Sequence, residues 1–207
     1  GIDRAAAPAL TAERRAAQAG SADIGARASA AEKIARLLGG PEDAGSLFNR
    51  MSAFDQALRS LANSPDSAPA QQAVVGAASS FVQRVNAIAN AYQDIRASAD
   101  KDIASTVEDV NSALNELGRL NDQIASATVA GRDASALLDQ RDGVLDRIND
   151  AIPVKPLIRE NGRVDLMTVE GVMLFSGTAR QIQFSNTPVI AAGMTLAGGS
   201  LSGLTVD

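Results

Sequence analysis

The densest group of ionisable side chains lies in the stretch Asp139-Gln140-Arg141-Asp142, with Asp146 one helical turn further on. Two neighbouring carboxylates can perform general acid–base catalysis when their surroundings separate their pKa values. Such chemistry also needs a nucleophile or a second base, and the chain has no histidine and no cysteine. Histidine is the usual base near neutral pH, and imidazole and thiolate are common ligands of zinc. We therefore interpret the cluster as a structural network on a helix, and we predict no enzyme activity and no catalytic, cofactor or metal site.

Three other patterns that could bind a ligand fail on their spacing. A calcium-binding loop aligned on Gly143 would place Leu138 and Gln140 at its first two ligand positions. The pair Gly198-Gly199 does not lie between a strand and a helix, so it does not predict a phosphate-binding loop. The pair Arg14-Arg15 is too small for a basic patch, and we interpret it as a solvated helix face.

The composition excludes several classes of partner. The net charge is -5, with 19 Lys and Arg against 24 Asp and Glu, whereas nucleic-acid binding needs a basic face. No apolar run approaches the roughly 20 residues that span a bilayer, and no signal-peptide pattern begins the chain. We thus predict no nucleic-acid, membrane or small-molecule partner. Because the chain begins at Gly1 and ends at Asp207 without a closing element, we expect a fragment of a longer protein.

The element that must position these residues is one very long helix, expected over residues 69–129. Its apolar residues recur at steps of four and three, which is typical of one face of a helix in a coiled coil. No proline and no glycine pair interrupts them, and such a helix would be roughly 90 Å long. The seam consists of Val74, Ala78, Phe81, Val85, Ile88, Tyr92, Ile95, Ala99, Ile103, Val107, Val110, Leu114, Leu117, Asn121 and Ile124.

Three shorter helices are expected at about 11–38, 46–62 and 134–152. Thr11 is the predicted N-cap of the first, and Gly39-Gly40-Pro41 ends it. The first helix has a weak apolar seam, made of Ala17, Ile24, Ala28, Ala31, Ala35 and Leu38. The seam of the second helix is made of Leu47, Met51, Phe54, Leu58 and Leu61.

The long helix and the helix at 134–152 have seams that fit each other in an antiparallel register. If the connecting loop centres on Gly131, paired positions have numbers that sum to about 262. The register matches Leu117 with Leu145, and it matches the polar residue of each seam, Asn121 with Arg141. A polar pair inside a seam fixes register at some cost in stability. We predict that the Arg141 guanidinium hydrogen-bonds across this interface to Asn121, within reach of Asp122.

After Pro153 the helical periodicity gives way to short β-branched runs separated by turn residues. The runs 154–159 and 163–169 flank Glu160-Asn161-Gly162, and Asn-Gly is a strong hairpin signal. Further strands are expected at 172–176, 179–184 and 204–206, with a loop after Pro188. The predicted fold class is therefore α+β. A helical rod domain at 1–152, an elongated antiparallel bundle built around one very long helix, precedes a small antiparallel β module at 153–207.

The segment Leu137-Leu138-Asp139-Gln140-Arg141-Asp142 resembles a signature of the FlgK family of flagellar hook-associated proteins. Five further segments resemble that family, in the same order and spacing, across positions 46–185. They are Phe54-Asp55-Gln56-Ala57-Leu58, Leu61-Ala62-Asn63-Ser64-Pro65-Asp66, Ala70-Gln71-Gln72-Ala73-Val74-Val75, Leu117-Gly118-Arg119-Leu120-Asn121-Asp122-Gln123-Ile124 and Leu174-Phe175-Ser176-Gly177-Thr178-Ala179-Arg180. The family's terminal helices, which drive its polymerisation, have no counterpart here. The structural signature is taken as Leu137, Leu138, Asp139, Gln140, Arg141, Asp142 and Asn121.

The resemblance implies a structural adaptor at the junction between the flagellar hook and filament. It implies an extracellular location on the bacterial flagellum and export through the flagellar type III pathway without a cleaved signal peptide. The implied partners are neighbouring copies of the chain, the hook protein and the second junction protein. Two alternatives stay open: another axial protein, flagellin-like or the second junction protein, and a sensory or ligand-binding helical bundle. The β module and the tight alanine-rich seam count against the second alternative.

Overall fold

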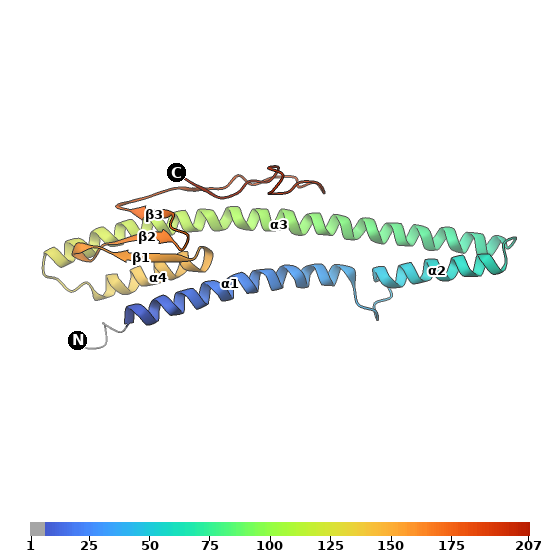
Figure 1. Cartoon of the computed structure of the whole chain (residues 1–207), viewed down its shortest axis with the longest axis horizontal. Coiled ribbons are helices and arrows are strands. Elements are labelled where there is room, and N and C mark those ends of the chain that lie inside the picture. The colour runs from blue at the N-terminus through green and yellow to red at the C-terminus, as the bar shows by residue number, and fades with distance from the viewer. Residues whose placement is uncertain (1–6) are drawn as a thin grey trace. The chain divides into compact units, whose positions relative to one another are not determined.

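The computed structural model describes the backbone of residues 7–207 and the side chains from Leu10 onward. The chain is an α+β protein in which four helices precede a small antiparallel sheet (Figure 1). This confirms the predicted fold class. The helices are α1 (Ala7–Leu38), α2 (Leu47–Asn63), α3 (Ala68–Val129) and α4 (Ser135–Ala151).

Helix α3 is one uninterrupted helix of 62 residues, which confirms the predicted rod. Its length at 1.5 Å per residue is about 93 Å. The C-terminal part of its seam, from Val107 to Ile124, is buried. Towards the N-terminus the seam is open, since Val85, Tyr92 and Ile103 are each more than 40% exposed.

Two details of the shorter helices differ from the prediction. Thr11 lies inside α1 and does not cap it. The helix begins earlier, at Ala7, because a proline is tolerated in the first turn of a helix and alanine favours helix on either side of Pro8. The predicted seam of α1 is also wrong: Ile24 is 69% exposed, and from Leu10 onward the buried side chains of α1 are Arg15 and Ala19. Helix α2 begins one residue after the expected start at 46, because the Ser46 hydroxyl accepts from the Asn49 N–H at 3.2 Å and caps the helix.

The chain divides into two compact units, each with its own contacts. The first comprises residues 1–26, 100–188 and 194–207, and the second comprises 27–99 and 189–193. Inside the second unit α2 packs on α3 through the stacked rings of Phe54 and Phe81, whose centroids are 6.5 Å apart. The Arg84 guanidinium donates to the Leu37 carbonyl at 2.6 Å. This contact places a cation at the C-terminus of α1, where the helix dipole favours it.

A four-stranded antiparallel sheet has the order β1 (Val154–Ile158), β2 (Val164–Thr168), β3 (Met173–Ser176) and β4 (Thr178–Ala179). A second sheet pairs β5 (Ile182–Gln183) with β6 (Thr205–Val206). The predicted strand at 179–184 is thus split between two sheets. Its second half leaves the first sheet because Asn111 of α3 binds the backbone of Ile182 through both a donor and an acceptor.

The Asn-Gly signal marks the turn between β1 and β2. A short 3₁₀ turn at Glu160–Gly162 joins the two strands, and Asn161 and Gly162 have φ angles of 61° and 75°. Asparagine and glycine tolerate this left-handed region better than other residues. The turn thereby brings the Gly162 carbonyl towards α4.

The core lies where β1–β3 cover α3 and α4, all within the first unit (Figure 1). A close contact forms at Gly118, where an added Cβ would be 3.2 Å from the Phe175 ring. The buried core residues include Val107, Val110, Leu114, Leu117, Val144, Leu145, Ile148, Val154, Leu166, Leu174 and Phe175.

Candidate functional site

The seam residue Asn121 of α3 binds the sheet rather than α4. Its amide donates to the Val164 carbonyl at 2.8 Å and accepts from the Val164 N–H at 3.1 Å. The Arg159 N–H donates to the Arg163 carbonyl, so Arg163 faces β1. In an antiparallel pair the N–H and C=O of the next residue, Val164, then point away from β1. Since β3 pairs only with Leu166 and Met167, Asn121 takes the place of a missing neighbouring strand.

Arg141 of α4 binds the same hairpin from the other side. Its Nη1 donates to the Gly162 carbonyl at 2.5 Å, and the side chain is 9% exposed. The predicted hydrogen bond between Arg141 and Asn121 is therefore wrong, and Asp122 is paired with Arg163 instead. The physical reason is that the hairpin backbone offers both polar seam residues better-oriented partners. We call Asn121 and Arg141 the hairpin anchor.

The antiparallel register of α3 and α4 itself agrees with the observed contacts. Arg147 of α4 forms an ion pair with Glu116 of α3 at 2.5 Å, and these numbers sum to 263. Leu117, Leu145 and Ile148 all belong to one core cluster.

Two further polar side chains of α3 hold the chain that follows the sheet. Asn111 donates to the Ile182 carbonyl and accepts from its N–H, each at 2.9 Å. Asp100 accepts from the Thr187 N–H at 2.6 Å and is buried. Together with Asn121, these residues form a row of side chains along α3 that bind backbone groups of residues 153–207.

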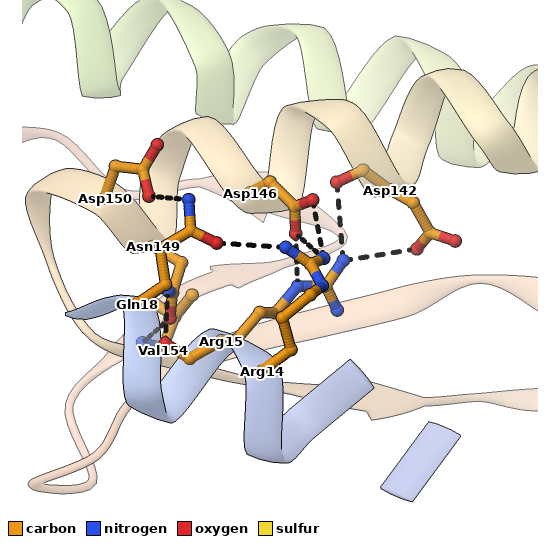
Figure 2. A network of polar contacts seen from close by, with 8 residues as sticks. All are labelled: Arg14, Arg15, Gln18, Asp142, Asp146, Asn149, Asp150 and Val154. Carbon is orange, nitrogen blue, oxygen red and sulfur yellow. Dashed lines mark hydrogen bonds and ion pairs between the residues drawn. The ribbon is translucent and has the colours of Figure 1, made fainter. Parts of the chain in front are cut away.

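A second polar network joins α1 to α4, and we call it the clasp (Figure 2). Arg14 binds Asp146 through Nη2, with oxygen distances of 2.7 and 2.9 Å. The Arg15 Nε donates to Oδ1 of the same carboxylate at 2.6 Å, and the Arg15 Nη2 lies 3.4 Å from Asp142. The Arg15 side chain is 6% exposed, so the interpretation of Arg14-Arg15 as a solvated face is wrong for Arg15.

Asn149 and Gln18 extend the clasp to the start of β1. Asn149 donates to the Arg15 carbonyl at 2.8 Å and accepts from the Val154 N–H at 3.3 Å (Figure 2). Gln18 donates to Asp150 at 2.7 Å. Asn149 therefore links three elements, since it sits on α4 and contacts both α1 and β1.

The ionisation of two groups in this region is shifted. Burial raises the pKa of Asp146, but hydrogen bonds from Arg15 and Arg14 and their charges outweigh it, so its pKa lies below the usual range. Burial lowers the pKa of Arg141. The negative charge of Asp142 opposes this decrease, and the positive charge of Arg15 adds to it. A guanidinium loses its proton only far above neutral pH, so Arg141 remains charged.

The residues of the structural signature divide into two groups. Leu137 and Leu138 are half-buried and Arg141 is buried, whereas Asp139, Gln140 and Asp142 are exposed. Of the three exposed residues, Asp142 contacts Arg15. Within the segment, Leu137 packs against the core, Arg141 belongs to the hairpin anchor and Asp142 belongs to the clasp.

The arrangement is suited to holding elements together. Among residues 7–207 there is no cluster of three or more His, Cys, Asp or Glu side chains that could bind a metal ion. No described helix is both long and apolar enough to cross a membrane. Every carboxylate of the clasp contacts an arginine or amide group of the same network.

Sequence reasoning missed Arg15, Asn111 and Asn149. A usable signal for Arg15 was present, because Asp142, Asp146 and Asp150 recur every four residues and require a basic partner. For the two asparagines no periodic signal exists, since an amide can bind water as readily as a backbone.

The chain was compared with protein families and with known proteins. Residues 31–205 match the family model described as the flagellar hook-associated protein FlgK helical domain. The chain is 29% identical over 185 residues to flagellar hook-associated protein 1 of Escherichia coli, covering 88% of this chain and 34% of that protein. For flagellar hook-associated protein 1 of Bacillus subtilis the identity is 26%, covering 71% of this chain and 29% of that protein.

A solved structure has the same fold. The flagellar hook junction protein FlgK from Burkholderia pseudomallei superposes with a TM-score of 0.69 over 83% of this chain and 30% of that chain, at 23% identity. The chain thus spans about a third of the length of the relatives that it matches.

Proposed function

Because the chain belongs to the FlgK helical-domain family, we propose that it forms the helical part of a structural subunit at the junction between flagellar hook and filament. The observation that carries the proposal is the extent of the family match. It runs through α2, α3, α4 and the sheet, and so includes the hairpin anchor and the long seam. A sensory bundle has no comparable support.

The geometry supports a mechanical role for this region. Helix α3 is a continuous strut, and polar side chains at Asp100, Asn111 and Asn121 fasten the β module to it. We propose that 1–152 acts as the rod and 153–207 as a module fixed to its side. Under this proposal the hairpin anchor supports the fold and does not contact a neighbouring subunit.

The proposed partners are neighbouring copies of the protein and other axial proteins of the flagellum, namely the hook protein and the second junction protein. The proposed location is the extracellular flagellum, reached through the flagellar type III pathway without a cleaved signal peptide. The open apolar stripe of α3, which includes Val85 and Tyr92, is available for packing between helices in such an assembly. No enzymatic step forms part of the proposal.

Deletion of the gene that encodes this chain tests the proposal in the source bacterium. We expect cells that build hooks but carry no filaments, observed by electron microscopy, and that do not swim in soft agar. The intact gene supplied in trans should restore both. Filaments of normal number and length on the deleted strain would contradict the proposed role.

A further inference from the structure

The contact between α1 and α4 contains very little apolar surface. Within the described side chains of α1 up to Ala26, the buried residues are Arg15 and Ala19. This part of α1 is instead joined to α4 by hydrogen bonds, three of them from Arg14 or Arg15 to Asp146. The hydrophobic effect, which holds most packed helices in place, thus contributes little here.

The α4 side of the contact is a regular acidic stripe. Asp142, Asp146 and Asp150 recur every four residues and so lie on one face of the helix. Opposite them α1 presents Arg14, Arg15 and Gln18 (Figure 2). An interface made of ion pairs and amide contacts is weakened by dissolved salt, whereas an apolar interface is not.

We infer that the clasp is releasable: at high ionic strength or in acid it opens and residues 10–26, the N-terminal half of α1, detach from α4, while α3, α4 and the sheet stay folded. Opening returns the Arg14, Arg15 and Asp146 charges to water and, among the described side chains of α1 up to Ala26, exposes one buried methyl group, that of Ala19. The retained core is unaffected because the cluster of α3, α4 and strand residues contains no residue of α1.

The direction of the acid effect follows from the groups that surround Asp146. From α1 it faces Arg14 and Arg15, and the same network on α4 includes Arg141, Asp142 and Asp150, with the amides of Gln18 and Asn149 beside them. Its depressed pKa means that the closed clasp gains stability above the pKa of the free side chain, near pH 4. That stability is lost as the pH falls through the lower pKa of the closed state. Neutral Asp146 would leave the arginines facing one another without their main counter-charge.

Thiol labelling measures the opening directly, because the chain has no cysteine of its own. Ala19→Cys places a thiol at a buried position of the clasp, and Ala16→Cys places a matched thiol on the exposed face of the same helix. On raising NaCl from 50 mM to 1 M at constant pH, we expect the labelling rate at position 19 to rise about tenfold relative to position 16. An unchanged ratio would overturn the inference.

Hydrogen exchange with mass spectrometry tests whether the opening is local. In Asp146→Asn at low salt and neutral pH, residues 10–26 should exchange about tenfold faster than in the unaltered chain, while 107–124 keep their protection. Asp55→Asn is the control, since it removes the exposed ion pair with Arg59 on α2 and should leave 10–26 unchanged. Equal acceleration of 10–26 and 107–124 would mean global unfolding and would refute a separate clasp.

Discussion

Replacing Asn121 by alanine should destabilise the chain far more than an exposed asparagine-to-alanine change does. Asn121 is 3% exposed, and its amide satisfies both the N–H and the C=O of Val164, which is itself 1% exposed. Removing the amide leaves two buried backbone groups without partners, at about 1–3 kcal/mol each. The better helix propensity of alanine returns about 0.5 kcal/mol. The expected net loss in free energy of unfolding is therefore about 1.5–5.5 kcal/mol.

Asn115→Ala is the matched control, because Asn115 lies on the exposed face of the same helix. It should change the free energy of unfolding by no more than about 0.5 kcal/mol. Urea unfolding followed by circular dichroism compares the two variants, and amide exchange at Val164 reports the lost acceptor. If Asn121→Ala equalled the control in stability and Val164 kept its protection, water or another side chain would replace the amide and the anchor reasoning would fail.

Four other outcomes are expected. Gly118→Val should lower the melting temperature, because the new side chain would displace the Phe175 ring, which lies 3.2 Å from the ideal Cβ position. Gly76→Ala should instead raise the free energy of unfolding by up to about 1 kcal/mol, since nothing lies within 4 Å of its Cβ position. Phe54→Ala should cost about 1–2 kcal/mol in calorimetry, because its half-buried ring is stacked, while the 62% exposed Phe48 should be replaceable by alanine at little cost. Residues 1–207 alone should sediment as a monomer at tens of micromolar, because polymerisation is expected to need the family's terminal helices; a stable ring or filament formed by these residues alone would contradict that expectation. Addition of EDTA or of divalent zinc should leave the melting temperature within error, in keeping with the absence of a metal-binding cluster among the described residues.

The helices and strands could be predicted from the sequence because each leaves a local pattern. The four-and-three spacing from Val107 to Ile124 persists in the buried face of α3, and Asn161-Gly162 occupies the turn that it indicates. The resemblance to the FlgK family rested on short segments in order and is confirmed by the family match. Periodicity fails in α1, where many alanines make every face look equally apolar. Its buried face is instead marked by Arg15.

The partners of the polar seam residues could not be predicted from two helices alone. The register correctly brought α3 and α4 together, and within that pair Asn121 could find only Arg141 opposite it. The fold adds a third element, the hairpin backbone at Gly162 and Val164, whose groups carry no side-chain signal in the sequence. A polar residue in an apolar seam therefore predicts that something polar must meet it, but does not say whether that is a side chain or a backbone.

The same reasoning explains why the fold contains both a tight attachment, at Asn121 of α3, and a loose one, at Asp146 of α4. Asn121 binds the N–H and the C=O of Val164, and both residues are buried. Breaking this contact therefore leaves two backbone groups without a partner and out of reach of water. Asp146 holds two arginines at an interface whose members all reach water once α1 moves away. Ion pairs that become solvated on opening cost little to break, whereas a buried backbone pair costs the full desolvation of both groups. The hairpin anchor should accordingly survive salt concentrations at which the clasp is open.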